Sequence, residues 1–146
     1  MEIKKYEIYV REISKMDFYS QYFSDADDVY RFATEKLRMH ELDRERVVAI
    51  SVDSKGKVIG VTDESIGGLN SAMFCPREIL KFLILGNAAG VFLLHNHPSG
   101  DVNPSINDIA VTEKLKKALE PFDISLVDHL VVSREGFTSL KERGHC

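Results

Sequence analysis

Three side chains able to bind one metal ion lie within a short segment, HNHPSGDVNPSIND, at residues 95–108. The segment follows an unbroken apolar run, Gly90 to Leu94, which is typical of a central strand covered on both faces. Because side chains alternate along a strand, His95 and His97 are expected to project to the same face. Two imidazoles placed in this way at the end of a strand can reach a single ion.

A carboxylate follows on the next predicted element, a helix that begins at Ser105 and ends near Leu119 or Glu120. Asp108 shares one face of this helix with three apolar residues, Val111, Leu115 and Leu119. A carboxylate that heads a core-facing stripe costs several kcal/mol unless a cation or hydrogen-bond donor meets it. Two His nitrogens, one Asp oxygen and a water form the arrangement typical of catalytic zinc. The sequence therefore predicts one Zn²⁺ per chain, held by His95, His97 and Asp108.

A simpler interpretation of the same residues remains open. Ser105-Ile106-Asn107-Asp108 is also an S-x-x-D capping box, in which the two polar side chains satisfy the first N–H groups of a helix. Pro98 and Gly100 indicate only a turn. The capping interpretation accounts for Ser105 and Asp108 but leaves the paired histidines unexplained.

The elements that must position these residues follow from apolar periodicity and turn signals. Strands and helices mingle along the whole chain, which favours one mixed sheet with helices packed on it, and we expect one domain over 1–146. The predicted strands are an N-terminal edge strand at Ile3 to Ile13, a hairpin of Arg44 to Val52 and Val58 to Val61, the central run, Ile124 to Ser133, and Phe137 to Leu140. Two further helices are predicted to begin near Ser24 to Asp27 and at Pro76.

The composition of the 146-residue chain is that of a globular protein, with 44% apolar and 29% charged residues. Its net charge of −4 argues against non-specific binding to nucleic acid. Two cysteines, at 75 and 146, form neither a disulfide framework nor a zinc-ribbon pair. No apolar block resembles a signal peptide or a membrane span. These features predict a cytoplasmic protein.

The spacing H-x-H-P-x6-S-x2-D, from His95 to Asp108, resembles the full signature of the JAMM (MPN+) metalloproteases without a gap. The longer string HNHPSGD is similar to the RadC branch of that family, as are PREI at 76–79, GLNSA at 68–72 and LVDHLVVS at 126–133. The resemblance extends from about Ala26 to Leu140. Longer RadC relatives carry an N-terminal helix-hairpin-helix region, whereas no G-x-G hairpin precedes Arg44 here. The family's association with DNA repair therefore has little support in this sequence.

This resemblance implies an α/β fold bordering on α+β, a three-layer, cytidine-deaminase-like JAMM/MPN domain with a mixed sheet between helices. It also implies that Ser105 helps to stabilise a tetrahedral oxyanion and that a glutamate on an earlier strand deprotonates the water on the metal. The motif does not fix the position of that glutamate; Glu45 is our first candidate, and Glu64 and Glu78 are the alternatives. His129, in an apolar strand, is interpreted as a structural histidine, with a contact behind the site or to substrate as the alternative.

The resulting prediction is a zinc-dependent hydrolase, of the metallopeptidase or isopeptidase kind, that acts on a peptide or protein. One alternative is a non-catalytic interaction module of the same fold, associated with DNA repair or mobile elements. Another is a metal-dependent nuclease. His95-Asn96-His97 spells HNH, but in HNH nucleases these three residues are spread over a ββα-metal unit and are not consecutive. A zinc nucleoside deaminase would need H-x-E and P-C-x-x-C, and the sequence has neither. The sequence does not identify the substrate or the oligomeric state.

Overall fold

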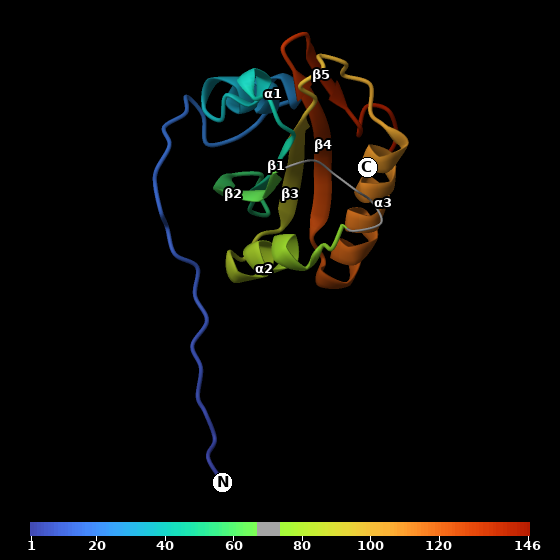
Figure 1. Cartoon of the computed structure of the whole chain (residues 1–146). Helices are drawn as coiled ribbons and strands as arrows, with labels where there is room; N and C mark the ends of the chain where they lie inside the picture. Colours follow the sequence, from blue (N-terminus) through green and yellow to red (C-terminus); the bar gives the residue numbers. More distant parts are fainter. Residues whose placement is uncertain (67–73) are drawn as a thin grey trace.

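The computed structural model describes residues 1–66 and 74–146, and within them five strands form one mixed sheet. Figure 1 shows this sheet in the middle of the molecule with helices on both sides of it. The order across the sheet is β2-β1-β3-β4-β5. The strands are β1 (Arg46–Val52), β2 (Val58–Ile66), β3 (Gly90–Asn96), β4 (Ser125–Ser133) and β5 (Gly136–Ser139). The central strand, β3, pairs antiparallel with β1 and parallel with β4.

Helices cover both faces of this sheet. On one face α2 (Arg77–Leu85) and α3 (Ile106–Leu119) pack against alternate residues of β1 and β3, including Val47, Ala49, Val91 and Leu93. On the other face α1 (Ala26–Glu35) and the short 3₁₀ helix η1 (Met39–Glu41) pack against Val48, Ile50, Leu94, Leu130 and Val132. A second 3₁₀ turn, η2 (Glu120–Phe122), follows α3. The three-layer α/β architecture expected from the sequence is confirmed.

The local sequence explains why these elements begin where they do. The side chain of Asp25 caps α1 by accepting a hydrogen bond from the Asp28 N–H, and Pro76 immediately precedes α2. In the β1–β2 hairpin, the Asp53 carboxylate accepts hydrogen bonds from two backbone N–H groups, and Gly56 adopts a φ of +81°. Each predicted helix and hairpin strand therefore forms, with bounds shifted by a few residues.

The predicted N-terminal strand, Ile3 to Ile13, was wrong. No strand is assigned there, and Ile3, Ile8 and Ile13 are about four-fifths exposed. The N-terminal segment approaches the sheet at Tyr22, which forms an isolated bridge with Lys57 at the start of β2. Alternation of apolar and charged residues favours an extended chain, but a strand also needs a neighbour to take its backbone hydrogen bonds, and this segment extends away from the sheet (Figure 1).

The GLNSA motif at 68–72 lies outside the described residues. Among the residues that are described, none belongs to a helix with the length and apolarity needed to cross a bilayer.

We expect Leu115→Ala to lower the free energy of unfolding by about 2–5 kcal/mol, because Leu115 on α3 is fully buried against the sheet and its truncation leaves a cavity. Urea unfolding followed by circular dichroism measures the change. Ile106→Ala on the same helix is the control, since Ile106 is 89% exposed and its loss should change stability little. Equal effects of the two substitutions would contradict the packing described here.

Candidate metal centre

The two histidines lie at the end of β3, on the face of the sheet that α3 covers. His95 is in the strand, paired with Val47 of β1, and His97 follows one residue after its last position, Asn96. Pro98, which has no N–H to donate to a neighbouring strand, comes directly afterwards. The alternation expected from the sequence therefore directs both imidazoles to the same side.

A tight turn after β3 fixes the orientation of the His97 ring. The Gly100 N–H donates to the His97 carbonyl at 3.1 Å, and Gly100 has a φ of +90°, a conformation that favours glycine. The chain thereby returns so that the Asp101 carbonyl oxygen lies 2.7 Å from Nδ1 of His97. The Asp101 side chain accepts hydrogen bonds from the backbone and side-chain N–H groups of Asn103 within the loop.

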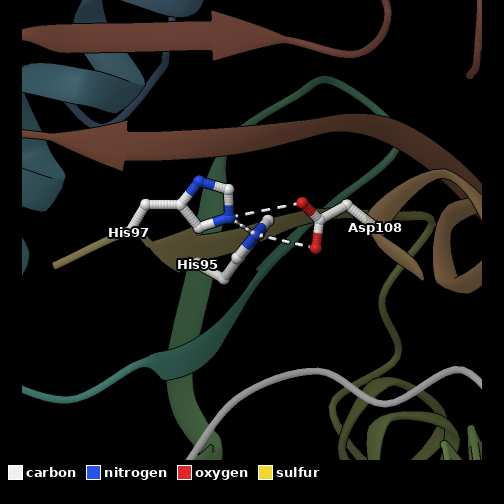
Figure 2. A group of neighbouring side chains, drawn as sticks. All are labelled: His95, His97 and Asp108. Atoms are coloured by element: carbon white, nitrogen blue, oxygen red, sulfur yellow. Dashed lines mark hydrogen bonds and ion pairs between the residues drawn. The ribbon is translucent and has the colours of Figure 1, made fainter. Parts of the chain in front are cut away.

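The third side chain enters from the first turn of α3. Asp108 Oδ1 lies 3.1 Å from His95 Nε2, its Oδ2 lies 3.2 Å from His97 Nε2, and the two Nε2 atoms are 3.0 Å apart. Figure 2 shows the two rings and the carboxylate pointing toward a common centre. One ligand atom from each of the three residues lies within 4.8 Å of the others, so the group could hold a metal ion.

The same aspartate also completes the capping box. The Ser105 hydroxyl accepts from the Asp108 N–H at 3.1 Å, and Asp108 Oδ2 accepts from the Ser105 N–H at 2.7 Å. The capping interpretation of S-x-x-D is therefore confirmed, and it does not exclude the metal site, because the capping carboxylate also faces both histidines. The cap fixes the carboxylate in the orientation that the histidines require.

The site is buried at His95 and Asp108 and partly accessible at His97. The side chains of His95 and Asp108 are 1% and 5% exposed, and that of His97 is 13% exposed. Burial raises the pKa of Asp108, but the adjacent imidazoles of His95 and His97 outweigh it and hold this pKa well below its ordinary value. The pKa of His97 is raised, first by its bond with Asp108, while burial opposes the shift; the Asp101 carbonyl and the charge of Glu45 add to it.

The hydrogen-bond chemistry of this donor set fits a cation. A carbonyl oxygen can only accept, so Nδ1 of His97 must carry the hydrogen that it donates to Asp101, and a neutral ring then has a bare lone pair on Nε2. That lone pair faces the carboxylate of Asp108, which is also an acceptor. Such a convergence of acceptors is repulsive unless a positive charge lies among them, either a proton on Nε2 of His97, which its raised pKa favours, or a metal ion. Two His nitrogens with one Asp oxygen suit Zn²⁺.

Glu45 lies immediately before β1, the neighbour of β3. The β1–β3 register pairs Val47 with His95, and continuing it by two residues brings Glu45 opposite His97, on the same face of the sheet. The buried side chain of Asn96 holds the backbone on either side of Glu45: its Oδ1 accepts from the Arg46 N–H at 2.6 Å and its Nδ2 donates to the Arg44 carbonyl at 2.9 Å.

The two alternative glutamates lie elsewhere. Glu64 is on β2, which β1 separates from β3, and burial, followed by the charges of Glu78 and Asp63, raises its pKa to about 7. Glu78 is exposed in the first turn of α2 and forms an ion pair with Lys81 at 3.0 Å. Of the three carboxylates, Glu45 is the one beside the strand that pairs with β3, and its charge is among those that raise the pKa of His97.

Thr112 was not among the residues predicted from the sequence, and His129 was predicted to be structural, with a contact behind the site as the alternative. Nε2 of His129 lies 2.8 Å from Nδ1 of His95, and its Nδ1 lies 2.6 Å from the Thr112 hydroxyl. Both residues are fully buried, and burial, followed by the charge of His95, lowers the pKa of His129 well below its usual range. The histidine is therefore both buried in the core and a contact behind the site.

The mixed sheet between helices and the His-His-Asp group at the end of its central strand are those of a JAMM-type domain with a group that could hold a metal ion. Residues 23–145 match the sequence model of the RadC-like JAB domain, and the chain belongs to this family. Proteins named UPF0758 protein are similar to it: one from Thermotoga maritima is 43% identical over 116 residues, 80% of this chain and 51% of that protein. One from Moorella thermoacetica is 46% identical over 105 residues, 72% and 46% of the two chains. One from Desulfitobacterium hafniense is 37% identical over 134 residues, 92% and 58%. The chain thus spans about half the length of the curated relatives it matches.

The two roles of Asp108 can be separated by substitution. Asp108→Asn keeps an oxygen that can accept from the Ser105 N–H but removes the negative charge. Loss of a residue that only supports a metal ligand lowers metal affinity by roughly 10- to 100-fold, and we expect Asp108→Asn to lower zinc affinity by more than that. Ser105→Ala removes the cap, and it should cost about 1 kcal/mol of stability while zinc affinity persists. Competition with a chromophoric chelator measures affinity, and urea unfolding measures stability. If both variants lost affinity equally, the cap alone would explain Asp108.

The raised pKa of Glu64 predicts a pH-dependent stability. Its folded-state pKa of about 7 lies above the ordinary 4.5, so the folded protein keeps a proton that the unfolded chain releases. Stability should therefore fall as the pH rises from about 4.5 to 7. Glu64→Gln removes this cost, and because the group is partly exposed we expect about 1 kcal/mol, or about 3 °C in Tm, at pH 8. Thermal melts at pH 4 should show no difference between the variant and the wild type; a gain there would point to a cause other than ionisation.

Proposed function

We propose that this chain is a zinc-dependent hydrolase that cleaves peptide or isopeptide bonds in a protein substrate. The observation that carries the proposal is the convergence of His95 Nε2, His97 Nε2 and the Asp108 carboxylate on one point at the end of β3. Three protein ligands with one side open to solvent are the arrangement of catalytic rather than structural zinc sites. A zinc ion bound there would lower the pKa of a coordinated water toward about 7 and polarise a substrate carbonyl.

Glu45 is the proposed general base. The β1–β3 register would place Glu45 opposite His97. The hydrogen bonds of Asn96 to the backbone of Arg44 and Arg46 would hold the Glu45 carboxylate at the rim of the site. From there it would accept a proton from the attacking water and transfer it to the leaving amine, as general acid–base catalysis of amide hydrolysis requires. The charge of Glu45 already acts on the pKa of His97, which supports this proximity.

Ser105 is proposed to assist at the developing oxyanion. Its hydroxyl oxygen accepts a hydrogen bond from the Asp108 N–H, so its own hydrogen is available for donation. The residue is exposed at the start of α3, where the positive end of the helix dipole also favours a developing negative charge. The choice of an amide bond as the substrate rests on the resemblance to the JAMM metalloproteases.

We expect Glu45→Gln to bind zinc as the wild type does and to lose turnover by about 10²- to 10⁴-fold, because the charged base is lost while the ligands remain. The assay uses zinc-loaded protein on a panel of fluorogenic peptides and lysine-isopeptide conjugates, with metal content measured in parallel. Glu78→Gln is the matched control, since Glu78 is an exposed carboxylate on α2, and it should keep full activity.

Three outcomes would replace the proposal. Loss of turnover in Glu64→Gln but not in Glu45→Gln would move the base to β2. Full zinc occupancy without cleavage of any amide substrate would favour a non-catalytic interaction module. Cleavage of single-stranded DNA that disappears in Asp108→Ala would favour a metal-dependent nuclease.

A further inference from the structure

The ring of His95 has a partner on its far side, in the neighbouring parallel strand. Nε2 of His95 faces Asp108 and His97, while its Nδ1 lies 2.8 Å from Nε2 of His129. The β3–β4 register pairs His129 with Leu93, two residues before His95, so that both histidines lie under α3. Neither has water access, since their exposed fractions are 0% and 1%.

The direction of the hydrogen bonds behind His95 follows from Thr112. Its hydroxyl oxygen lies 2.7 Å from the Asp108 carbonyl oxygen and 2.6 Å from Nδ1 of His129. The carbonyl can only accept, so the single hydroxyl hydrogen is donated to it. The hydroxyl oxygen must then accept from His129, and Nδ1 of His129 must carry a hydrogen.

The same assignment of donors and acceptors extends to His95. His129 is buried with no carboxylate on either ring nitrogen, so its ring is neutral and its second nitrogen, Nε2, carries a lone pair. That lone pair can only accept, so Nδ1 of His95 is the donor. In a neutral His95 ring, Nε2 is then left unprotonated and directed at the centre of the site.

We propose that Thr112 and His129 are positioning residues that hold His95 in the tautomer with a free Nε2 lone pair, ready for a metal ion. The chain of hydrogen bonds runs from the His95 ring through His129 and the Thr112 hydroxyl to the backbone of Asp108, whose side chain is another ligand. Two of the three ligands, on β3 and α3, are thereby tied to each other by a buried network. Outer contacts of this kind fix the ring orientation and basicity of a ligating histidine.

The inference rests on the metal site of the proposed function but not on its hydrolytic activity. Thr112→Val keeps the shape of the side chain and removes the hydroxyl, so His129 loses the acceptor for its Nδ1 hydrogen. His129 can then adopt the other tautomer and donate to His95, which places the hydrogen of His95 on Nε2. We expect zinc affinity to fall by about 10- to 100-fold, measured by chelator competition. Thr112→Ser keeps the hydroxyl and is the matched control, with affinity close to that of the wild type.

Long-range ¹H–¹⁵N NMR of the metal-free protein, at alkaline pH where the rings are neutral, reads the tautomers directly. In the wild type and Thr112→Ser, His95 and His129 should both carry their hydrogen on Nδ1, whereas in Thr112→Val both should shift to Nε2. A merely structural role for Thr112 would leave these signals unmoved.

Hydrogen on Nε2 of either ring in the wild type, or equal zinc affinity in the Val and Ser variants, would overturn the proposal. Absence of zinc binding by the wild type would defeat the proposed function instead, and the NMR result would still decide the hydrogen-bond chain.

Discussion

A carboxylate confined between two imidazole nitrogens, away from water, is the constraint on which this structure depends. Asp108 is 3% exposed, and its oxygens lie 3.1 and 3.2 Å from the Nε2 atoms of His95 and His97. A charge in such surroundings is stable only where cations or donors replace the lost water. The elements around it, a strand end, a tight turn and a helix start, determine where these three groups meet.

The helix cap shows how one residue meets a local and a long-range demand together. An ionised carboxylate has two oxygens and about four acceptor positions, so Oδ2 can take the Ser105 N–H and still face His97, while Oδ1 faces His95. Capping restricts the carboxylate in the metal-free protein, which would reduce the ordering required to bind an ion there. The S-x-x-D pattern therefore serves both the helix and the site.

Local patterns in the sequence predicted the elements and the ligand group, because each depends on spacing along the chain. The apolar stripe of α3 and the alternation at the end of β3 place Asp108 and His95 on facing surfaces. The N-terminal strand failed because alternation does not supply a pairing partner. The contact of His129 with His95 depends on the register between two parallel strands, which the sequence does not state, so only the possibility of a contact could be named.

The connection from β3 through α3 to β4 explains why the site and its supporting network occur together. Parallel pairing of β3 with β4 requires a crossover, and α3 supplies it on the face where His95 and His129 lie. The first turn of the crossover helix brings Asp108 to the front of His95. Four residues later, one helical turn on, the same helix brings Thr112 to His129 behind it. A single helix therefore lies on both sides of the His95 ring, and a shift of α3 along the sheet would disturb the candidate metal group and the hydrogen-bond chain together.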